Sequence, residues 1–339
     1  MSETFDNANE RLRISLVIPV RDEAATIQHL LDSIAAQTRR PDEVLIVDGG
    51  SRDETVELLR HAGERDATLR VVEAGEATPG RGRNVGIAAA RHDWIALTDA
   101  GNRLEPDWLE RLEDVVRRDP SVTVVYGNFE PVADTFFERC AALTYPPPKQ
   151  SRAGEWMRGP FIASSLLKRE VWQSVGGFPD LRAAEDLMFM EAVEREGWKT
   201  GWSPRATVWW QLRPTLASTF RKFVLYSRHN VWAGRQRFWH YGIARQYALV
   251  AVFVLLALLH SRWWLVLPVL GLAARAAKSI WRRREGRGIL WALNPAQFAG
   301  VAALIVTIDA ATFVGWAQAL VRSPAPANST PRAAHKSQS

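Results

Sequence analysis

The chain has 339 residues, with 43 lysines and arginines against 37 aspartates and glutamates, and 47% of its side chains are hydrophobic. On a prior of roughly 150 residues per unit, this length suggests about two structural units. A single cysteine, Cys140, excludes a disulfide framework and a zinc site built from cysteines, and it fits a reducing compartment. The first residues have no apolar stretch behind a basic one, so we expect no cleaved signal peptide.

Residues 12–214 alternate short β-rich runs with amphipathic helical patterns. This alternation predicts an α/β domain with a mainly parallel central sheet. A helix should follow the first strand, with Asp22 as its N-cap and with Ile27, Leu30 and Ile34 on its buried face. The expected strands cover residues 14–18, 44–47, 69–73, 94–98 and 122–126.

Capping patterns predict where further helices begin and end. Residues 51–54, Ser-Arg-Asp-Glu, fit a capping box that opens the second helix. Pro106 suits the first position of a later helix, and Gly197 closes a helix over residues 184–196. Residues 145–158 contain three consecutive prolines, charged residues and a glycine, which predicts a mobile loop.

Charge is distributed unevenly along the chain. Residues 243–339 carry 11 basic and 2 acidic side chains, whereas residues 1–242 carry 32 and 35. Between Glu196 and Glu285 there is no carboxylate side chain, although nine of the 15 tryptophans lie there. Basic and aromatic residues together suit nucleic acid or an anionic membrane surface. Long apolar runs in the same stretch favour a membrane, so we expect membrane lipids and no nucleic acid as partners.

Three apolar segments are expected to cross a bilayer, whose hydrocarbon core of about 30 Å needs about 20 helical residues. An amphipathic region at 215–240 precedes them and suits the lipid interface, and a disordered tail at 322–339 follows them. Residues 260–262 would form the tip of a hairpin between the first two spans, and one long kinked helix is the alternative. The expected spans cover about 241–260, 262–281 and 296–320.

The loop at 278–287, between the second and third spans, is rich in arginine. The positive-inside rule places such a loop in the cytoplasm. Because an even number of crossings precedes it, the N-terminal domain should lie on the same side. We therefore expect a multi-pass protein of the inner (cytoplasmic) membrane whose N-terminal domain faces the cytoplasm.

Polar or turn residues follow three of the expected strands, in the segments 19–23, 48–51 and 99–102. In open parallel sheets, ligands bind beyond the carboxyl ends of the strands. Two carboxylates and a glycine turn at that edge suit a ribose, a base edge and a metal-bound diphosphate. An aspartate after a strand is also a common cap, and for any single segment that interpretation is the stronger one.

Four segments together resemble the family 2 glycosyltransferases of the GT-A fold. They cover roughly residues 12–215 in the order and spacing of that family, and membrane segments often follow the catalytic domain there. They read SLVIPVRDEAATI, VLIVDGGSRDET, PGRGRNVGIAAARHDWIALTDAGNRLEPDWL and VGGFPDLRAAEDLMFMEAVEREGW.

The resemblance implies an inverting enzyme that moves a sugar from a nucleotide-diphospho-sugar, a UDP- or GDP-sugar, to an acceptor. The acceptor would be a hydroxyl or a lipid phosphate, on a lipid-linked or saccharide molecule. Synthesis of a glycolipid or a cell-surface polysaccharide would be the setting.

The resemblance also implies roles for single residues around the donor. Pro19 and Glu23 would lie in the loop that holds the nucleoside, and Asp48 would bond the base or the ribose. Arg83 and Asn84 would lie near the diphosphate.

Three acidic positions would carry the chemistry. Asp99 matches the first aspartate of the metal-binding DxD motif, and Glu185-Asp186 matches the acidic pair, with Asp186 as catalytic base. A carboxylate can accept the proton of an attacking hydroxyl, and a helix N-terminus favours its ionised form. Taken without the resemblance, Glu185 and Asp186 are more simply partners of the helix dipole.

Two departures from the family pattern matter. The DxD motif reads Asp99-Ala100-Gly101, so a divalent cation, Mg²⁺ or Mn²⁺, would bind through Asp99 and the Asn102 amide, or mainly through the diphosphate. The Gln-x-x-Arg-Trp motif of processive members is missing, which disfavours a processive polymer synthase. The incomplete DxD motif also leaves open a non-catalytic membrane scaffold with a decayed donor site.

Two remaining patterns are ambiguous. Arg213, Arg221 and Lys222 lie between the two expected units, where they would gather the phosphate of a lipid acceptor or anchor the chain to anionic head groups. The two interpretations are equally open. The glycines at 80, 82 and 86 mimic a dinucleotide-binding fingerprint, but the spacing is one residue too long and no strand directly precedes them.

Overall fold

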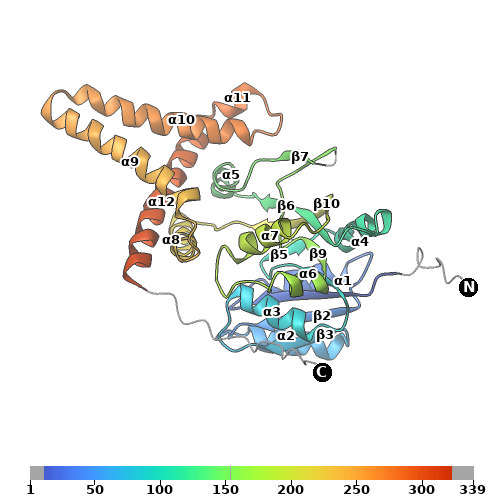
Figure 1. Cartoon of the computed structure of the whole chain (residues 1–339). Helices are drawn as coiled ribbons and strands as arrows, with labels where there is room; N and C mark the ends of the chain where they lie inside the picture. Colours follow the sequence, from blue (N-terminus) through green and yellow to red (C-terminus); the bar gives the residue numbers. More distant parts are fainter. Residues whose placement is uncertain (1–10, 153, 323–339) are drawn as a thin grey trace, which may run out of the picture.

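A computed structural model describes residues 11–152 and 154–322. An eight-stranded sheet with helices on both faces forms one part, and long helices project from it in the other (Figure 1). The order of the strands is β3-β2-β1-β4-β9-β6-β10-β5. Their bounds are Ile14–Val20 (β1), Glu43–Asp48 (β2), Leu69–Glu73 (β3), Trp94–Leu97 (β4), Asn102–Leu104 (β5), Val124–Val132 (β6), Ser165–Lys168 (β9) and Thr200–Gln211 (β10).

The sheet is mixed but mostly parallel, which confirms the predicted α/β fold. Strand β1 pairs in parallel with β2 and β4, β2 with β3, and β6 with β10. Strand β9 runs antiparallel between β4 and β6, and β5 runs antiparallel along β10. The sequence patterns did not indicate β5, β9 or β10.

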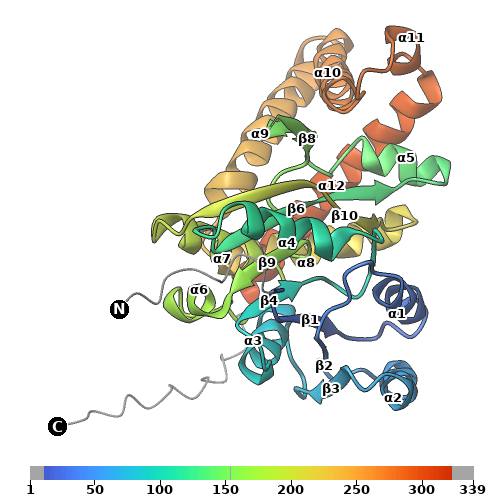
Figure 2. The same ribbon diagram turned by 90° about the vertical axis from the view of Figure 1, so that its right-hand side faces the viewer.

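The two faces of the sheet have separate hydrophobic cores because side chains alternate along each strand. Leu16 and Ile18 of β1 belong to one core, whereas Val17 belongs to the other. Figure 2 shows α1 and α2 on the opposite side of the sheet from α3. The helices on the first face are α1 (Ile27–Ala35), α2 (Thr55–Arg65) and α4 (Trp108–Arg118), and those on the second are α3 (Pro79–Ala89), α6 (Arg169–Ser174) and α7 (Glu185–Arg195).

Two of the predicted helix starts are wrong. Helix α1 has Thr26 as its N-cap, and Asp22 instead has a positive φ of 54° in the turn before it. Helix α4 begins at Trp108, because the chain makes a turn in which the Trp108 N–H donates to the Glu105 carbonyl, so Pro106 stays outside the helix.

The predicted capping box at 51–54 is also wrong. Helix α2 has Glu54 as its N-cap, and no side chain caps it. The Ser51 hydroxyl instead accepts the Asp22 N–H at 2.9 Å, and the Thr55 hydroxyl accepts the Glu23 N–H at 2.9 Å. These hydroxyls therefore join the loops after β1 and β2.

The segment 145–158 has no helix or strand at 145–149, as the predicted loop requires, but beyond these residues the loop prediction is wrong, and its mobility stays a prediction. It contains an antiparallel hairpin of β7 (Gln150–Arg152) and β8 (Glu155–Met157). The buried guanidinium of Arg158 fixes the base of this hairpin through the Pro147 carbonyl, at 2.9 Å, and through two carboxylates. Helix α5 (Phe136–Ala142) precedes it.

The C-terminal part consists of α8 (Leu216–Trp232), α9 (Gln236–Leu259), α10 (Val266–Arg282), the short α11 (Ile289–Ala292) and α12 (Pro295–Val321). Three stretches are long and apolar enough to cross a membrane, at Gln236–Leu259, Arg262–Arg282 and Pro295–Val321. The chain reverses after Leu259, so α9 and α10 form a hairpin and not one kinked helix (Figure 1).

Helix α8 connects the two parts by crossing α12 at close range. A Cβ on Gly315 of α12 would lie 2.4 Å from the Val224 carbonyl oxygen and 2.6 Å from the Ser227 Cβ. The Ser227 hydroxyl donates to the Thr312 carbonyl oxygen at 2.7 Å. Small residues allow this approach, as they do between membrane helices, so the sheet is held firmly to the third candidate span.

Candidate functional site

The carboxyl ends of β1, β2 and β4 meet at one edge of the sheet, because β1 pairs in parallel with both of its neighbours. Val20 of β1 is in register with Asp48 of β2, and Val17 with Leu97, two residues before Asp99. The predicted donor residues Asp48 and Asp99 therefore follow β2 and β4, the two strands that flank β1, at the same edge of the sheet.

Arg83 joins two of the predicted acidic residues. Its Nη1 donates to Glu185 Oε1 at 2.8 Å, and its Nη2 donates to Asp99 Oδ1 at 2.6 Å. The guanidinium is 3% exposed and lies 5.5 Å from the centre of the Phe178 ring. Side chains from α3, from the end of β4 and from the start of α7 are thus brought together.

The glycines of α3 explain how Arg83 reaches this position. A Cβ on Gly86 would lie 2.4 Å from Val17 Cγ1, and one on Gly82 would lie 3.1 Å from Pro19 Cβ. A Cβ on Gly80 would lie 2.1 Å from the Pro179 carbonyl oxygen. The glycine pattern therefore serves the close packing of α3 against β1 and against the loop before α7.

The acidic pair opens α7 from a strained turn. Ala184, directly before the pair, has a φ of 71°, a left-handed conformation that is uncommon for a residue with a Cβ. Asp186 Oδ1 accepts the Leu187 N–H at 2.8 Å. Among the described residues, no cationic side chain lies within ion-pair distance of Asp186, in contrast to Glu185.

Burial dominates the electrostatics of this pair. It raises the pKa of both carboxyls, although Arg83 acts in the opposite direction on each. The negative charge of Asp186 raises the pKa of Glu185 further. A carboxyl whose pKa is raised in this way is a better proton acceptor once it is ionised.

Asp48 organises the turn after β2. Its carboxylate accepts the N–H groups of Gly50, at 3.0 Å, and Ser51, at 3.1 Å. Gly50 has a φ of 82°, which suits glycine, and a Cβ on Gly49 would lie 2.9 Å from the Ala77 carbonyl oxygen. Glu23 lies in the neighbouring turn, where its carboxylate accepts the Thr26 hydroxyl.

Two predicted residues are engaged elsewhere. The side-chain oxygen of Asn84 accepts from Trp172 Nε1 and from the Phe178 N–H, and its nitrogen donates to the Phe178 carbonyl. Asn84 thereby fixes the loop before α7. Asn102 is 4% exposed, and its amide nitrogen lies 3.5 Å from Thr98 Oγ1.

These contacts narrow the choice of metal ligands. The Asp99 carboxylate is 42% exposed, and only its Oδ1 is bonded to Arg83. In the part of the chain that the structure describes, no three His, Cys, Asp or Glu side chains gather in a way that could hold a metal ion. Asp99 is therefore the one predicted ligand that is accessible, whereas Asn102 is buried.

The basic residues of the α8 region separate into two kinds. Arg213 and Arg221 are exposed, but Lys222 lies among aromatic rings. Its Nζ is 4.2 Å from the centre of the Trp210 ring, 5.3 Å from Tyr226 and 5.4 Å from Tyr145. We call these three rings and Lys222 the aromatic cage. Burial, with a smaller contribution from the positive charge of Arg213, lowers the pKa of Lys222 to about 7.

The aromatic cage adjoins the acidic site. Burial raises the pKa of Tyr226, and the negative charges of Asp186, Glu185 and Asp99 raise it further, which indicates their proximity. Sequence reasoning missed the three rings. Only Tyr226 had a usable signal, because it lies four residues after Lys222 and so on the same helix face.

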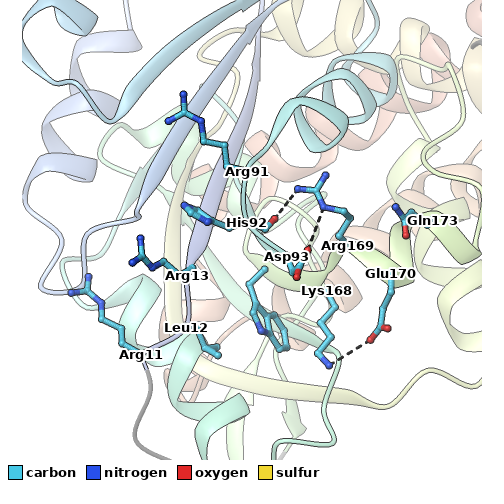
Figure 3. A pocket seen from close by; sticks show the side chains of 11 residues that line it. Arg11, Leu12, Arg13, Arg91, His92, Asp93, Lys168, Arg169, Glu170 and Gln173 are labelled. Atoms are coloured by element: carbon cyan, nitrogen blue, oxygen red, sulfur yellow. Dashed lines mark hydrogen bonds and ion pairs between the residues drawn. The ribbon is translucent and has the colours of Figure 1, made fainter. Parts of the chain in front are cut away.

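A cavity of about 820 Å³ lies at the opposite edge of the sheet, around the start of β1 and β4 (Figure 3). Its most buried cation, Arg169, donates to the backbone carbonyls of Ile87, Ala90 and His92. Arg169 is thus engaged in structural contacts, and none of the predicted site residues lines this cavity.

Two family profiles match the chain. The profile described as "Glycosyl transferase family 2" matches residues 15–170, and that described as "Glycosyl transferase family group 2" matches residues 94–306, more than half of the chain. The chain belongs to the family 2 glycosyltransferases. The second match includes Glu185-Asp186 and extends through α9 and α10.

Individual relatives agree with this assignment. The glycosyltransferase is 24% identical over 201 residues to the uncharacterized glycosyltransferase EpsJ of Bacillus subtilis, covering 54% of this chain and 56% of the relative. It is 30% identical over 173 residues to the glycosyltransferase AglE of Haloferax volcanii, covering 49% of this chain and 56% of the relative. The chain thus spans about half the length of these curated relatives.

A solved structure confirms the GT-A-like fold of the glycosyltransferase. The mannosyltransferase PcManGT from Pyrobaculum calidifontis, in complex with GDP-Man and Mn²⁺, superposes with a TM-score of 0.53. The two chains are 21% identical, and the superposition covers 92% of this chain and 88% of the other.

Proposed function

We propose that this glycosyltransferase moves a sugar from a nucleotide-diphospho-sugar to a membrane-bound acceptor, with inversion at the anomeric carbon. The observation that carries the proposal is the Arg83 bridge between Asp99 and Glu185, directly beside Asp186, at the carboxyl edge of the sheet. Ligands of open α/β sheets bind at that edge.

The donor would extend from β2 towards α3. Pro19, Glu23 and Asp48 surround the position proposed for the nucleoside, where the buried Asp48 has an acceptor oxygen to offer a base or a ribose hydroxyl. The diphosphate would lie towards Asp99. Arg83 holds Asp99 and Glu185 in place, and its charge offsets theirs as the negatively charged donor approaches.

In this arrangement a divalent cation would have one accessible protein carboxylate, that of Asp99, as a ligand. Mg²⁺ commonly uses one or two protein carboxylates together with substrate phosphates and water. Asp99, with one oxygen free of Arg83, would hold Mg²⁺ or Mn²⁺ against the diphosphate. When bound, the cation would neutralise the charge that develops on the leaving nucleoside diphosphate.

Asp186 is the proposed catalytic base. Its half-buried carboxylate would take the proton of an acceptor hydroxyl as that oxygen bonds to the anomeric carbon and the bond to the diphosphate breaks. An acceptor phosphate in its dianionic form would attack without a proton transfer. Inversion follows because a single displacement occurs on the face opposite the leaving group.

The proposed location is the cytoplasmic face of the inner membrane. Arg282 ends the second candidate span, and Arg283, Arg284 and Arg287 lie between it and the third, which favours the cytoplasm for this loop. Arg283 also donates to the Pro146 carbonyl at 2.6 Å, so the loop and the sheet domain lie on the same side. Nucleotide sugars would reach the site from the cytoplasm.

The test is a donor screen with the purified full chain in detergent, supplemented with bacterial lipid extract and Mn²⁺. We expect one UDP- or GDP-sugar to release nucleoside diphosphate, with faster release when lipid extract is present and loss of release in EDTA. If no donor in the panel releases nucleoside diphosphate, and none gives heat of binding in calorimetry, the enzyme proposal is wrong and the chain is a non-catalytic scaffold.

A further inference from the structure

A second cavity, of about 250 Å³, lies between the sheet domain and the candidate membrane spans. The loop after α5 and helix α8 form one side of it, and α9, α10 and α12 form the other. Three candidate spans contribute to it, so in a bilayer hydrocarbon would border that side of the cavity. Its apolar wall includes Tyr145, Phe223, Trp239, Ile243, Ile305 and Ile308.

The two charged groups in the wall neutralise each other. Arg275 of α10 donates to both oxygens of Asp309 of α12, at 2.5 and 2.9 Å, and the Tyr247 hydroxyl donates to Asp309 at 3.0 Å. Paired charges on facing helices are the form in which ionisable residues are tolerated at membrane depth. The wall therefore carries no net charge and accepts a hydrocarbon chain.

The cavity and the aromatic cage share one residue, Tyr145. The Tyr145 ring lies 5.2 Å from that of Phe223, another wall residue. Lys222 thus lies beside a wall residue of the cavity, Tyr145, and beside Tyr226, whose pKa the charges of the acidic site raise. Within the described ranges, no carboxylate lies within ion-pair distance of Lys222, and the exposed Arg213 adds positive charge nearby.

We propose that the cavity and Lys222 together bind a lipid phosphate, with the hydrocarbon chain in the cavity and the phosphate at Lys222 and Arg213. The order of groups along this path, from apolar wall to cation to catalytic carboxylates, matches the order of parts in such a molecule. This inference rests on the proposed function and names a lipid phosphate as an acceptor of that site.

The reaction balances without a further reactant. A phosphate oxygen of the lipid bonds to the anomeric carbon, and the bond between that carbon and the nucleoside diphosphate breaks with its electron pair leaving on the diphosphate. A dianionic phosphate has no proton to lose on the attacking oxygen. From a monoanionic phosphate, the proton would pass to Asp186.

The test measures binding without any donor, so it is independent of turnover. The full chain is placed in phosphatidylcholine nanodiscs and irradiated with farnesyl phosphate that carries a benzophenone at the chain end. We expect labelled peptides from α9 or α12 near Ile243 and Ile305. Unlabelled farnesyl phosphate should compete, whereas farnesol and inorganic phosphate should not.

Matched variants separate this site from general membrane anchoring. K222Q removes the caged cation and I243W fills the cavity, and each should reduce labelling at least about tenfold, as loss of a charged contact or of space predicts. R237Q, at an exposed cation near the start of α9, and L258W, on the lipid-facing side of α9, should stay within about twofold. I308F is the second cavity-filling variant, should I243W not fold.

Three outcomes would overturn the inference: an equal loss in R237Q, competition by farnesol, or labelling outside the cavity walls. A chain that turns over a nucleotide sugar but is not labelled refutes this inference and leaves the proposed function standing. A chain that is labelled as expected but turns over no donor supports the lipid site and refutes the proposed function.

Discussion

Arg83 holds two carboxylates that would otherwise repel each other at the edge of the sheet. Replacing it in R83M leaves Glu185 buried without a counter-charge, which typically costs about 3–5 kcal/mol. We expect turnover to fall at least about a hundredfold, and the thermal unfolding midpoint to drop. Both are measured on the purified chain, by diphosphate release and by a melting curve.

The control for this variant is R60M. It removes an exposed ion pair between Arg60 of α2 and Glu73 of β3. Such pairs contribute little to stability, so turnover and melting should stay close to those of the parent. An R83M protein with parental turnover would show that the bridge has no part in the chemistry.

Lys222 should make acceptor use depend on pH. Because its pKa is lowered to about 7, the side chain is cationic below that pH and becomes neutral as the pH rises through it. With farnesyl phosphate as acceptor, kcat/KM should therefore decline above about pH 7. In K222R the charge persists, so the decline should move to higher pH; a decline at the same pH in both proteins would contradict the assignment.

At the scale of elements, one ionic network joins the hairpin β7–β8 to the loop after α10. Arg158 bonds Glu130 at 2.9 Å and Glu285 at 2.6 Å, and Lys149 lies 2.8 Å from Glu130. Glu285 is the only carboxylate side chain between Glu196 and Asp309, and it adopts a positive φ of 49°. The network thus attaches the end of the α9–α10 helical hairpin to the segment that carries Tyr145.

We expect E285Q to loosen this attachment, because Arg158 loses one of its two anionic partners. Backbone amides of residues 143–158 should exchange hydrogen faster, as measured by mass spectrometry. The control is E155Q, which removes an ion pair between Glu155 of β8 and Arg205 of β10. It should leave the hydrogen exchange of residues 143–149 unchanged. Unchanged hydrogen exchange in E285Q would mean that the network does not restrain the segment 143–158 and its β7–β8 hairpin.

Two of the wrong predictions of helix starts share a cause. Ser51 and Asp22 are residue types that often cap helices, but their side chains bond to the neighbouring loop. A cap pattern specifies which hydrogen bonds a side chain is able to make and leaves open the partner that the fold supplies. Here the turn after β1 lies against the turn after β2, so the side chains of Asp22 and Ser51 bond to each other's turn and not to a helix N-terminus.

At the scale of the whole molecule, periodicity predicted the five strands that β1, β2, β3, β4 and β6 represent, and motif order indicated Asp99 and Glu185. Periodicity did not reveal the short antiparallel strands β5 and β9 or the long strand β10, whose partners are distant in sequence. The aromatic cage was hidden for the same reason, since Tyr145, Trp210 and Tyr226 come from a loop, a strand and a helix.

The three candidate spans imply a definite topology. With the arginine-rich loop in the cytoplasm, the turn at Ser261 should face outward, and the chain offers low background because its one cysteine, Cys140, is buried. In intact cells, S261C should react with a membrane-impermeant maleimide, whereas R284C should react only after permeabilisation. The reverse pattern would place the sheet domain outside and contradict cytoplasmic donor use.

The most direct test of the whole account is the separation of binding from turnover in D186N. The amide keeps the size of the side chain but is not a base, so with a hydroxyl acceptor transfer should fall at least about a thousandfold. Calorimetry should give a donor affinity within a few-fold of the parent. With a lipid phosphate acceptor, the loss should be smaller wherever the phosphate is dianionic. A D186N protein that transfers to both acceptors at the parental rate would contradict the account.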